Sequence, residues 1–171
     1  MSVDLDLVTV MSREGAARAW DQFDAVLTIE DSSEVSGFRI PGWGGVEQFV
    51  LKFDDTVSDL HGRRPPEAAQ VGEALAFARK VEGRKLLIHC EMGVSRSAGV
   101  ALAVLSERYG DGSEDEAVAH LLRIRPVASC NPRIVAIADG LLGREGRLER
   151  AWKSADDRRF TGKFFIPPGA A

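Results

Sequence analysis

A cysteine and an arginine six residues apart, Cys90 and Arg96, are the residues of this chain whose types and spacing best suit chemistry. Small and polar residues separate them, with Gly93 at the centre, and Ser97 follows directly. Successive backbone N–H groups in a tight turn attract an anion, as does the N-terminus of a helix. An arginine can also donate two parallel hydrogen bonds to a phosphate. The segment therefore predicts an oxyanion site that contains a nucleophile.

The thiolate, and not the thiol, is the nucleophilic form of cysteine, and positive surroundings favour it. The Ser97 hydroxyl can donate a hydrogen bond to the sulfur of Cys90. We therefore predict phosphoryl transfer through a cysteinyl-phosphate, with Cys90, Arg96 and Ser97 as catalytic residues. The predicted phosphate-binding residues are consecutive in the chain: Glu91, Met92, Gly93, Val94, Ser95 and Arg96.

The flanking segments indicate where this loop lies in the fold. The apolar run 86–88 predicts a strand that is buried on both faces, and the apolar run 98–109 predicts a buried helix that ends at Gly110. In an open α/β sheet, ligands bind at the carboxyl ends of the strands. The alternative is that Cys90 is only a buried core residue, as many cysteines are, but the combined pattern of strand, loop and helix disfavours this alternative.

Residues 89–97 read HCEMGVSRS. They resemble the His-Cys-x5-Arg-Ser/Thr signature of the protein tyrosine phosphatase superfamily, in the form typical of its dual-specificity branch. The resemblance implies a three-layer α/β fold with a mostly parallel sheet between helices, and catalysis without a metal or other cofactor. It also implies that His89 shapes the loop and does not act as the general base.

The resemblance covers roughly residues 5–143. Near its end, residues 123–126 and Asn131 match a C-terminal pattern of the family, in which Cys130 replaces an expected proline. We interpret Cys130 as a structural thiol in preference to a redox partner of Cys90.

A second segment, residues 51–56, could supply the proton that the leaving oxygen needs. This donor is usually a carboxylic acid on a mobile loop. The resemblance assigns the role to Asp55, and Asp54 and Asp59 remain alternatives. All three carboxylates could instead be simple turn residues, which aspartate favours. Arg63 and Arg64 follow, either as a solvated turn or as substrate contacts.

The expected substrates are phosphorylated proteins or peptides, with phosphotyrosine first and phosphoserine or phosphothreonine second. A phosphoinositide phosphatase usually has lysines in this loop, whereas here Glu91 is present. An RNA 5′-triphosphatase would need a basic surface, but the net charge is −4. A rhodanese-type sulfurtransferase needs neither Asp55 nor the pair Arg96-Ser97. A phosphotyrosine-binding module without turnover would lack the nucleophile or the acid.

Composition agrees with a globular enzyme: 171 residues, 44% hydrophobic and 28% charged. The net charge predicts no binding to nucleic acid. No apolar stretch is long enough for a signal peptide or a membrane span. Two cysteines do not form a disulfide framework, and a catalytic thiol must stay reduced, so a cytoplasmic location is expected. The protein is also expected to be a monomer.

Hydrophobic periodicity predicts the other elements. Strands are expected at 5–10, 25–29 and 46–53. Helices are expected at 13–20 after Ser12, at 67–81, at 114–125 after a capping box of Ser113 and Glu116, and at 132–142 after Asn131. Residues 30–45 predict a long loop. We interpret Trp43 as its anchor on the core in preference to a wall of a substrate pocket.

We assign residues 1–143 to a phosphatase domain and 144–171 to a C-terminal extension. The extension should form a helix to about Lys153 and then a tail. An aromatic patch in that tail, at residues 164–168, would dock on the domain or on a partner.

Overall fold

A computed structural model describes residues 5–163 of the chain. Its four strands form one sheet in the order β1-β4-β2-β3, and every neighbouring pair is parallel. The strands are β1 (Val8–Ser12), β2 (Ala25–Glu30), β3 (Glu47–Lys52) and β4 (Leu86–Cys90). Because all strands run the same way, their carboxyl ends meet at one edge, where Cys90 pairs with Ser12. The predicted parallel sheet is confirmed.

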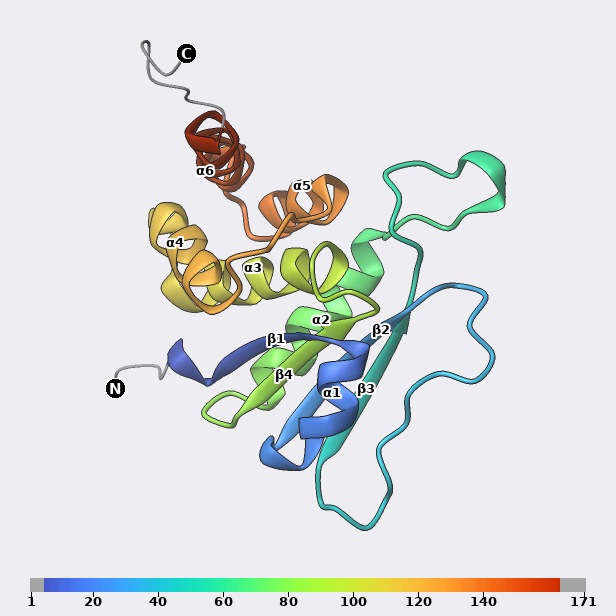
Figure 1. The fold of residues 1–171 in the computed structure, drawn as a ribbon. Coiled ribbons are helices and arrows are strands. Elements are labelled where there is room, and N and C mark those ends of the chain that lie inside the picture. The colour runs from blue at the N-terminus through green and yellow to red at the C-terminus, as the bar shows by residue number, and fades with distance from the viewer. Residues whose placement is uncertain (1–4, 164–171) are drawn as a thin grey trace, which may run out of the picture.

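Helices cover both faces of this sheet (Figure 1). Helix α1 (Arg13–Ala19) covers one face, together with apolar residues of the long loop between β2 and β3. Helices α2 (Ala68–Lys80) and α3 (Arg96–Tyr109) cover the other. Outside α3 pack α4 (Glu114–Ile124) and α5 (Pro132–Leu141), and α6 (Arg147–Lys163) packs on these two. The predicted three-layer α/β architecture is therefore confirmed.

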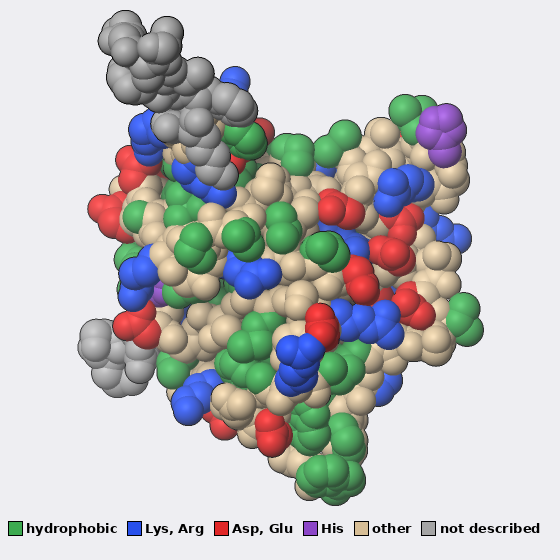
Figure 2. All heavy atoms as spheres, in the orientation of Figure 1, with side chains coloured by type: hydrophobic (Ala, Val, Ile, Leu, Met, Phe, Trp, Pro, Cys, Tyr) green, Lys and Arg blue, Asp and Glu red, His purple; other side chains and the backbone are tan. Residues whose placement is uncertain are grey.

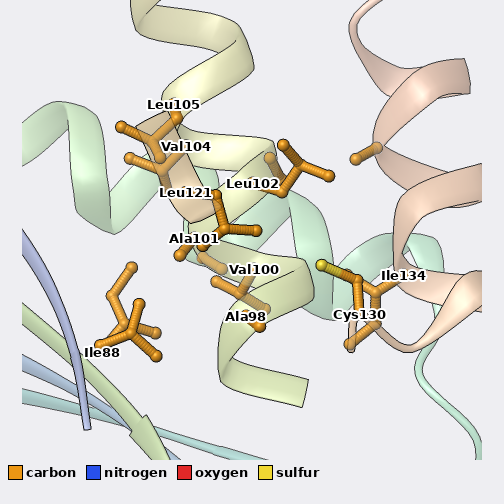
Figure 3. Close-up of a cluster of buried hydrophobic side chains, with 14 of the residues drawn as sticks. Ile88, Ala98, Val100, Ala101, Leu102, Val104, Leu105, Leu121, Cys130 and Ile134 are labelled. Carbon is orange, nitrogen blue, oxygen red and sulfur yellow. The ribbon is translucent and has the colours of Figure 1, made fainter. Parts of the chain in front are cut away.

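Helix α3 lies at the centre of the molecule, and every residue from Arg96 to Ser106 is buried. Its apolar side chains pack against Ile88 of β4 on one side and against Leu121 and Ile134 of the outer helices on the other (Figure 3). Gly99 allows the close contact with α5, because a Cβ there would lie 3.1 Å from Ile134. The continuous apolar run in the sequence reflects this burial on all sides.

The predicted helix caps have mixed outcomes. Ser12 accepts a hydrogen bond from Gly15 N at 3.1 Å, and Asn131 caps α5 through Arg133 N and Ile134 N, as predicted. The predicted capping box at Ser113 is wrong, because the Ser113 side chain makes no capping hydrogen bond. The first acid of the helix, Glu114, is buried and forms ion pairs with arginines of the C-terminal segment.

The C-terminal helix is longer than the sequence predicts: it continues to Lys163 and does not end near Lys153. The Asp139 carboxylate of α5 accepts hydrogen bonds from Gly146 N, Leu148 N and Glu149 N at the start of this helix. Farther along, a buried stripe at helical spacing packs against α4 and α5; it consists of Leu148, Ala151, Trp152 and Ala155. The predicted aromatic patch at 164–168 lies outside the described residues.

Two further differences concern the N-terminal half. Residues Leu5–Leu7 form a short 3-10 turn, so β1 begins at Val8 and continues to Ser12. Trp43 does not anchor its loop on the core: its side chain is 83% exposed, and it contacts the edge of Trp20 at 5.8 Å between ring centroids. Further 3-10 turns lie at Trp20–Gln22 and Leu60–Gly62. Within residues 5–163, no helix is both long and apolar enough to cross a bilayer.

Candidate active site

The segment 90–96 connects the central strand β4 to the buried helix α3, at the carboxyl edge of the sheet. Cys90 ends the strand and is only 3% exposed. Its Sγ lies 3.1 Å from the hydroxyl of Ser97 in the first turn of α3, within hydrogen-bond range for sulfur. The structure thus brings together the predicted nucleophile and the predicted thiolate donor.

The backbone carbonyls of this loop all point outward to donors from other parts of the chain. Glu91 O accepts from Arg13 N at 3.0 Å, and Val94 O accepts from Ser129 N at 2.8 Å. Ser95 O accepts from Asn131 N at 3.2 Å.

The two remaining carbonyls, of Met92 and Gly93, accept from the Arg125 guanidinium at 3.3 and 2.8 Å. In a trans peptide, the N–H of the next residue points opposite to the carbonyl. The N–H groups of residues 92–96 therefore turn inward, an arrangement that suits an anion.

Gly93 has a backbone φ of +65°, which a residue with a side chain rarely adopts. A Cβ at this position would also lie 2.4 Å from the backbone carbon and oxygen of Met11. Only glycine fits both requirements, so the central glycine seen in the sequence lets the loop pack against the end of β1.

The Arg96 guanidinium is buried beside Cys90 and is oriented from one side. Its Nη1 donates to Phe53 O at 2.9 Å and forms an ion pair with Asp31 Oδ1 at 2.7 Å. Its Nε is buried and has no hydrogen-bond partner among the described residues. A buried unpaired donor is costly. The Nε-bearing edge is therefore suited to bind an anion in the concave loop.

Asp55 lines the same hollow as Cys90 and Arg96. Its Oδ1 accepts hydrogen bonds from Ser95 Oγ at 2.8 Å and from Asn131 Nδ2 at 2.9 Å. Together with Cys90, Arg96 and the loop, it lines a cavity of about 260 Å³. The structure therefore places Asp55 beside the predicted nucleophile.

The two rival carboxylates occupy other environments. Asp54 is buried and points away from the cavity: it accepts hydrogen bonds from Ser32 N and Ser32 Oγ at 2.8 Å each and from Arg64 N at 2.7 Å. Burial opposes ionisation of Asp54, but these hydrogen bonds outweigh it and lower its pKa. Asp59 is exposed, before the turn at Leu60–Gly62, and its side chain does not cap that turn.

Arg63 and Arg64 are exposed and do not line the cavity. Over the side of the molecule where the loops after β2 and β3 lie, acidic and basic side chains are interleaved (Figure 2). This side therefore has no continuous basic surface.

His89 is buried under the loop, and burial lowers its pKa, so the ring is neutral near pH 7. Thr28 Oγ1 lies 2.8 Å from His89 Nε2 and also accepts from Gln48 Nε2 at 2.8 Å. Cys90 O lies 3.4 Å from His89 Nδ1 and can only accept, so the neutral ring carries its proton on Nδ1, and its Nε2 accepts from the Thr28 hydroxyl. His89 thus contacts the backbone of Cys90.

Both cysteines are free thiols. Cys130 lies among apolar side chains of the core beside Ile134 (Figure 3), and burial raises its pKa well above the usual range. A thiol in this state is a poor nucleophile, in keeping with its interpretation as a structural residue.

Sequence reasoning missed Asp31 and the contacts made by Asn131. Asp31 lies in the long Gly- and Pro-containing loop, whose sequence indicates only a connection between strands. Its single signal was its place directly after β2, at the ligand-binding edge of a parallel sheet.

No protein-family model matches the chain. Over 117 residues the chain is 32% identical to Dual specificity phosphatase 28 of Mus musculus, which covers 68% of this chain and 67% of that protein. It is 37% identical over 79 residues to Protein phosphatase Slingshot homolog 3 of Homo sapiens, which covers 44% of this chain. The chain spans only 12% of the length of that relative.

Among solved structures, Tk-PTP in its active form matches with a TM-score of 0.60 and 27% identity over 80% of this chain and 90% of that one. By its sequence, its fold and the arrangement around Cys90, the chain belongs to the dual-specificity phosphatase family of the protein tyrosine phosphatase superfamily.

Proposed function

We propose that this protein is a cysteine-dependent phosphatase that hydrolyses phosphate monoesters on proteins. Phosphotyrosine is the preferred substrate, and phosphoserine or phosphothreonine is the less preferred one. One observation carries the proposal: the buried Nε of Arg96 has no hydrogen-bond partner among residues 5–163, and it lies beside Cys90 in a loop whose N–H groups turn inward. A phosphate dianion in this loop would satisfy both sets of donors.

The reaction follows from these positions. Cys90 Sγ attacks phosphorus and forms the S–P bond, while the bond from phosphorus to the leaving oxygen breaks. Arg96 and the inward N–H groups stabilise the charge on the equatorial oxygens. Asp55 gives its proton to the leaving oxygen. Water then attacks the phosphocysteine and passes a proton to Asp55, which releases phosphate and restores the Cys90 thiolate.

Acidic groups near the cavity support a monophosphate substrate over a polyanionic one. Glu91 lines the cavity with a side chain that is 59% exposed, and Asp31 contacts Arg96. An inositol polyphosphate or a triphosphate end would bring further negative charge close to these carboxylates.

A comparison of substrates tests the proposal. Purified protein should hydrolyse p-nitrophenyl phosphate and phosphotyrosine peptides, with little turnover of inositol phosphates, triphosphate-ended RNA or thiosulfate. Cys90→Ser should lose nearly all turnover and still bind phosphotyrosine peptide, because Arg96 and the loop remain. Near-normal turnover by Cys90→Ser would contradict the covalent mechanism, and peptide binding without turnover by the unmutated protein would favour a binding module.

A further inference from the structure

The two sides of the Arg96 guanidinium have different environments. Nη1 forms an ion pair with Asp31 Oδ1 at 2.7 Å and donates a hydrogen bond to Phe53 O at 2.9 Å. Nε, on the opposite side of the group, carries no hydrogen bond within the described part of the chain. An arginine binds a phosphate through a fork of two parallel N–H donors. Occupation of Nη1 therefore leaves the edge that contains Nε to form this fork.

Asp31 is itself held in place by the protein. It follows β2 directly, and its neighbour Ser32 binds the buried carboxylate of Asp54 through both its N–H and its hydroxyl. On the other side, Glu30 is buried and paired with Arg39. The backbone around Asp31 is thus fixed on both sides, although the Asp31 side chain is 56% exposed.

We propose that Asp31 is a positioning residue that holds the Arg96 guanidinium with its Nε edge toward the phosphate. This inference rests on the proposed function and adds a residue that acts through Arg96 and not on the substrate. Asp31 has two separable properties: an oxygen 2.7 Å from Nη1, and a negative charge close to the anion site. The oxygen in contact with Nη1 orients Arg96, whereas the charge weakens the binding of any anion.

Two substitutions at Asp31 separate these properties. Asp31→Asn and Asp31→Ala remove the same charge, but the asparagine carbonyl keeps an oxygen beside Nη1. If this oxygen positions Arg96, Asp31→Ala should have a kcat on p-nitrophenyl phosphate ~10-fold below that of Asp31→Asn, because small misplacements of a catalytic group are costly. KM should fall or stay constant in both variants, since a neighbouring negative charge is gone.

Tungstate binding measured by calorimetry in a Cys90→Ser background gives a second readout that needs no turnover. Asp31→Asn should bind tungstate more tightly than the parent, since repulsion is removed. Asp31→Ala should bind it ~10-fold more weakly than Asp31→Asn, since the fork is no longer oriented. Equal tungstate affinities and equal kcat values for the two variants would overturn the inference.

Asp21→Ala provides the matched control, because Asp21 is an exposed carboxylate at the opposite edge of the sheet. It should leave kcat, KM and tungstate affinity unchanged. Thermal melting should show that all variants fold, since Ser32 anchors the loop independently of the Asp31 side chain. If the unmutated protein does not turn over p-nitrophenyl phosphate, the proposed function fails, and the tungstate comparison still decides the role of Asp31.

Discussion

Two hydrogen bonds reach the carboxylate of Asp55, from Ser95 and Asn131, and both end on Oδ1. The other oxygen, Oδ2, is then the one that can carry a proton toward a leaving group. Asn131 also donates to Thr56 O at 3.2 Å, so it holds the backbone that follows this acid. At the scale of the residue, the carboxylate proposed as the acid is thus held through Oδ1 and leaves Oδ2 available.

We predict that Asp55→Asn lowers kcat/KM on a phosphoserine peptide by ~10²- to 10⁴-fold, the range for loss of a general acid. The loss on p-nitrophenyl phosphate should be smaller, because that phenolate leaves readily without a proton. The variant should also lose the alkaline limb of the pH profile of kcat/KM. Asp59→Asn, an exposed control, should change neither. If Asp59→Asn showed these losses and Asp55→Asn did not, the acid would lie four residues farther along the chain.

Arg96→Lys tests the fork. A lysine ammonium is a point charge that cannot reproduce two parallel donors, and it cannot bind Phe53 O, Asp31 and a phosphate in the same geometry. We expect kcat/KM on aryl phosphate to fall by ~10²-fold or more, the scale for losing one preorganised oxyanion donor. Activity equal to that of the arginine enzyme would exclude the bidentate contact.

The geometry of the Cys90 loop could be predicted from sequence because its residues are local: the cysteine, glycine, arginine and serine lie within eight residues. The groups that hold the loop in its shape could not be predicted in this way. Arg125 lies 32 residues from Gly93, and Asn131 lies 76 residues from Asp55. Such contacts depend on how distant elements pack, which a single sequence does not show.

At the scale of the element, Asp54 joins two loops that meet at the site. Its carboxylate binds Ser32, which follows β2, and Arg64, which precedes α2. The loop that carries Asp31 and the loop that carries Asp55 thus share one buried anchor. This explains why the acid next to Asp55 is not available for catalysis.

Because the folded protein lowers the pKa of Asp54, ionised Asp54 stabilises the fold at pH values above its unfolded pKa. This stabilisation should be lost as pH falls from about 4 through the lower folded value. Asp54→Asn should reduce the free energy of unfolding at pH 7 by about 1–3 kcal/mol, because buried donors lose their partner. The substitution should also make the free energy of unfolding depend less on pH in the acid range. Urea denaturation between pH 3 and 7, with Asp59→Asn as control, measures both effects.

The elements themselves were predicted well where local pattern and burial agree, as in α3, and less well where a distant partner decides. The helix after residue 144 continues past Lys153 because Trp152 and Ala155 pack on neighbouring helices. The capping box of Ser113 and Glu116 does not form, because the Ser113 side chain makes no capping hydrogen bond. In the first case, packing against helices that precede α6 in the chain overrides the local preference.

At the scale of the whole molecule, the resemblance implies catalysis without a metal. Turnover of p-nitrophenyl phosphate should therefore be unchanged after dialysis against EDTA, whereas vanadate should inhibit at low concentration by occupying the loop. Loss of activity in EDTA, restored by added metal, would contradict this expectation.

The outward carbonyls of residues 91–95 have a consequence for folding. Their donors come from Arg13 near the start of the described chain and from Arg125, Ser129 and Asn131 near its end. A nascent chain that has emerged only as far as α3 contains the nucleophile and its arginine but lacks most of these donors. Catalytic competence should therefore appear late in synthesis. By mass action, an oxyanion bound in the finished loop at 100 times its Kd would stabilise the folded state by about 2.7 kcal/mol.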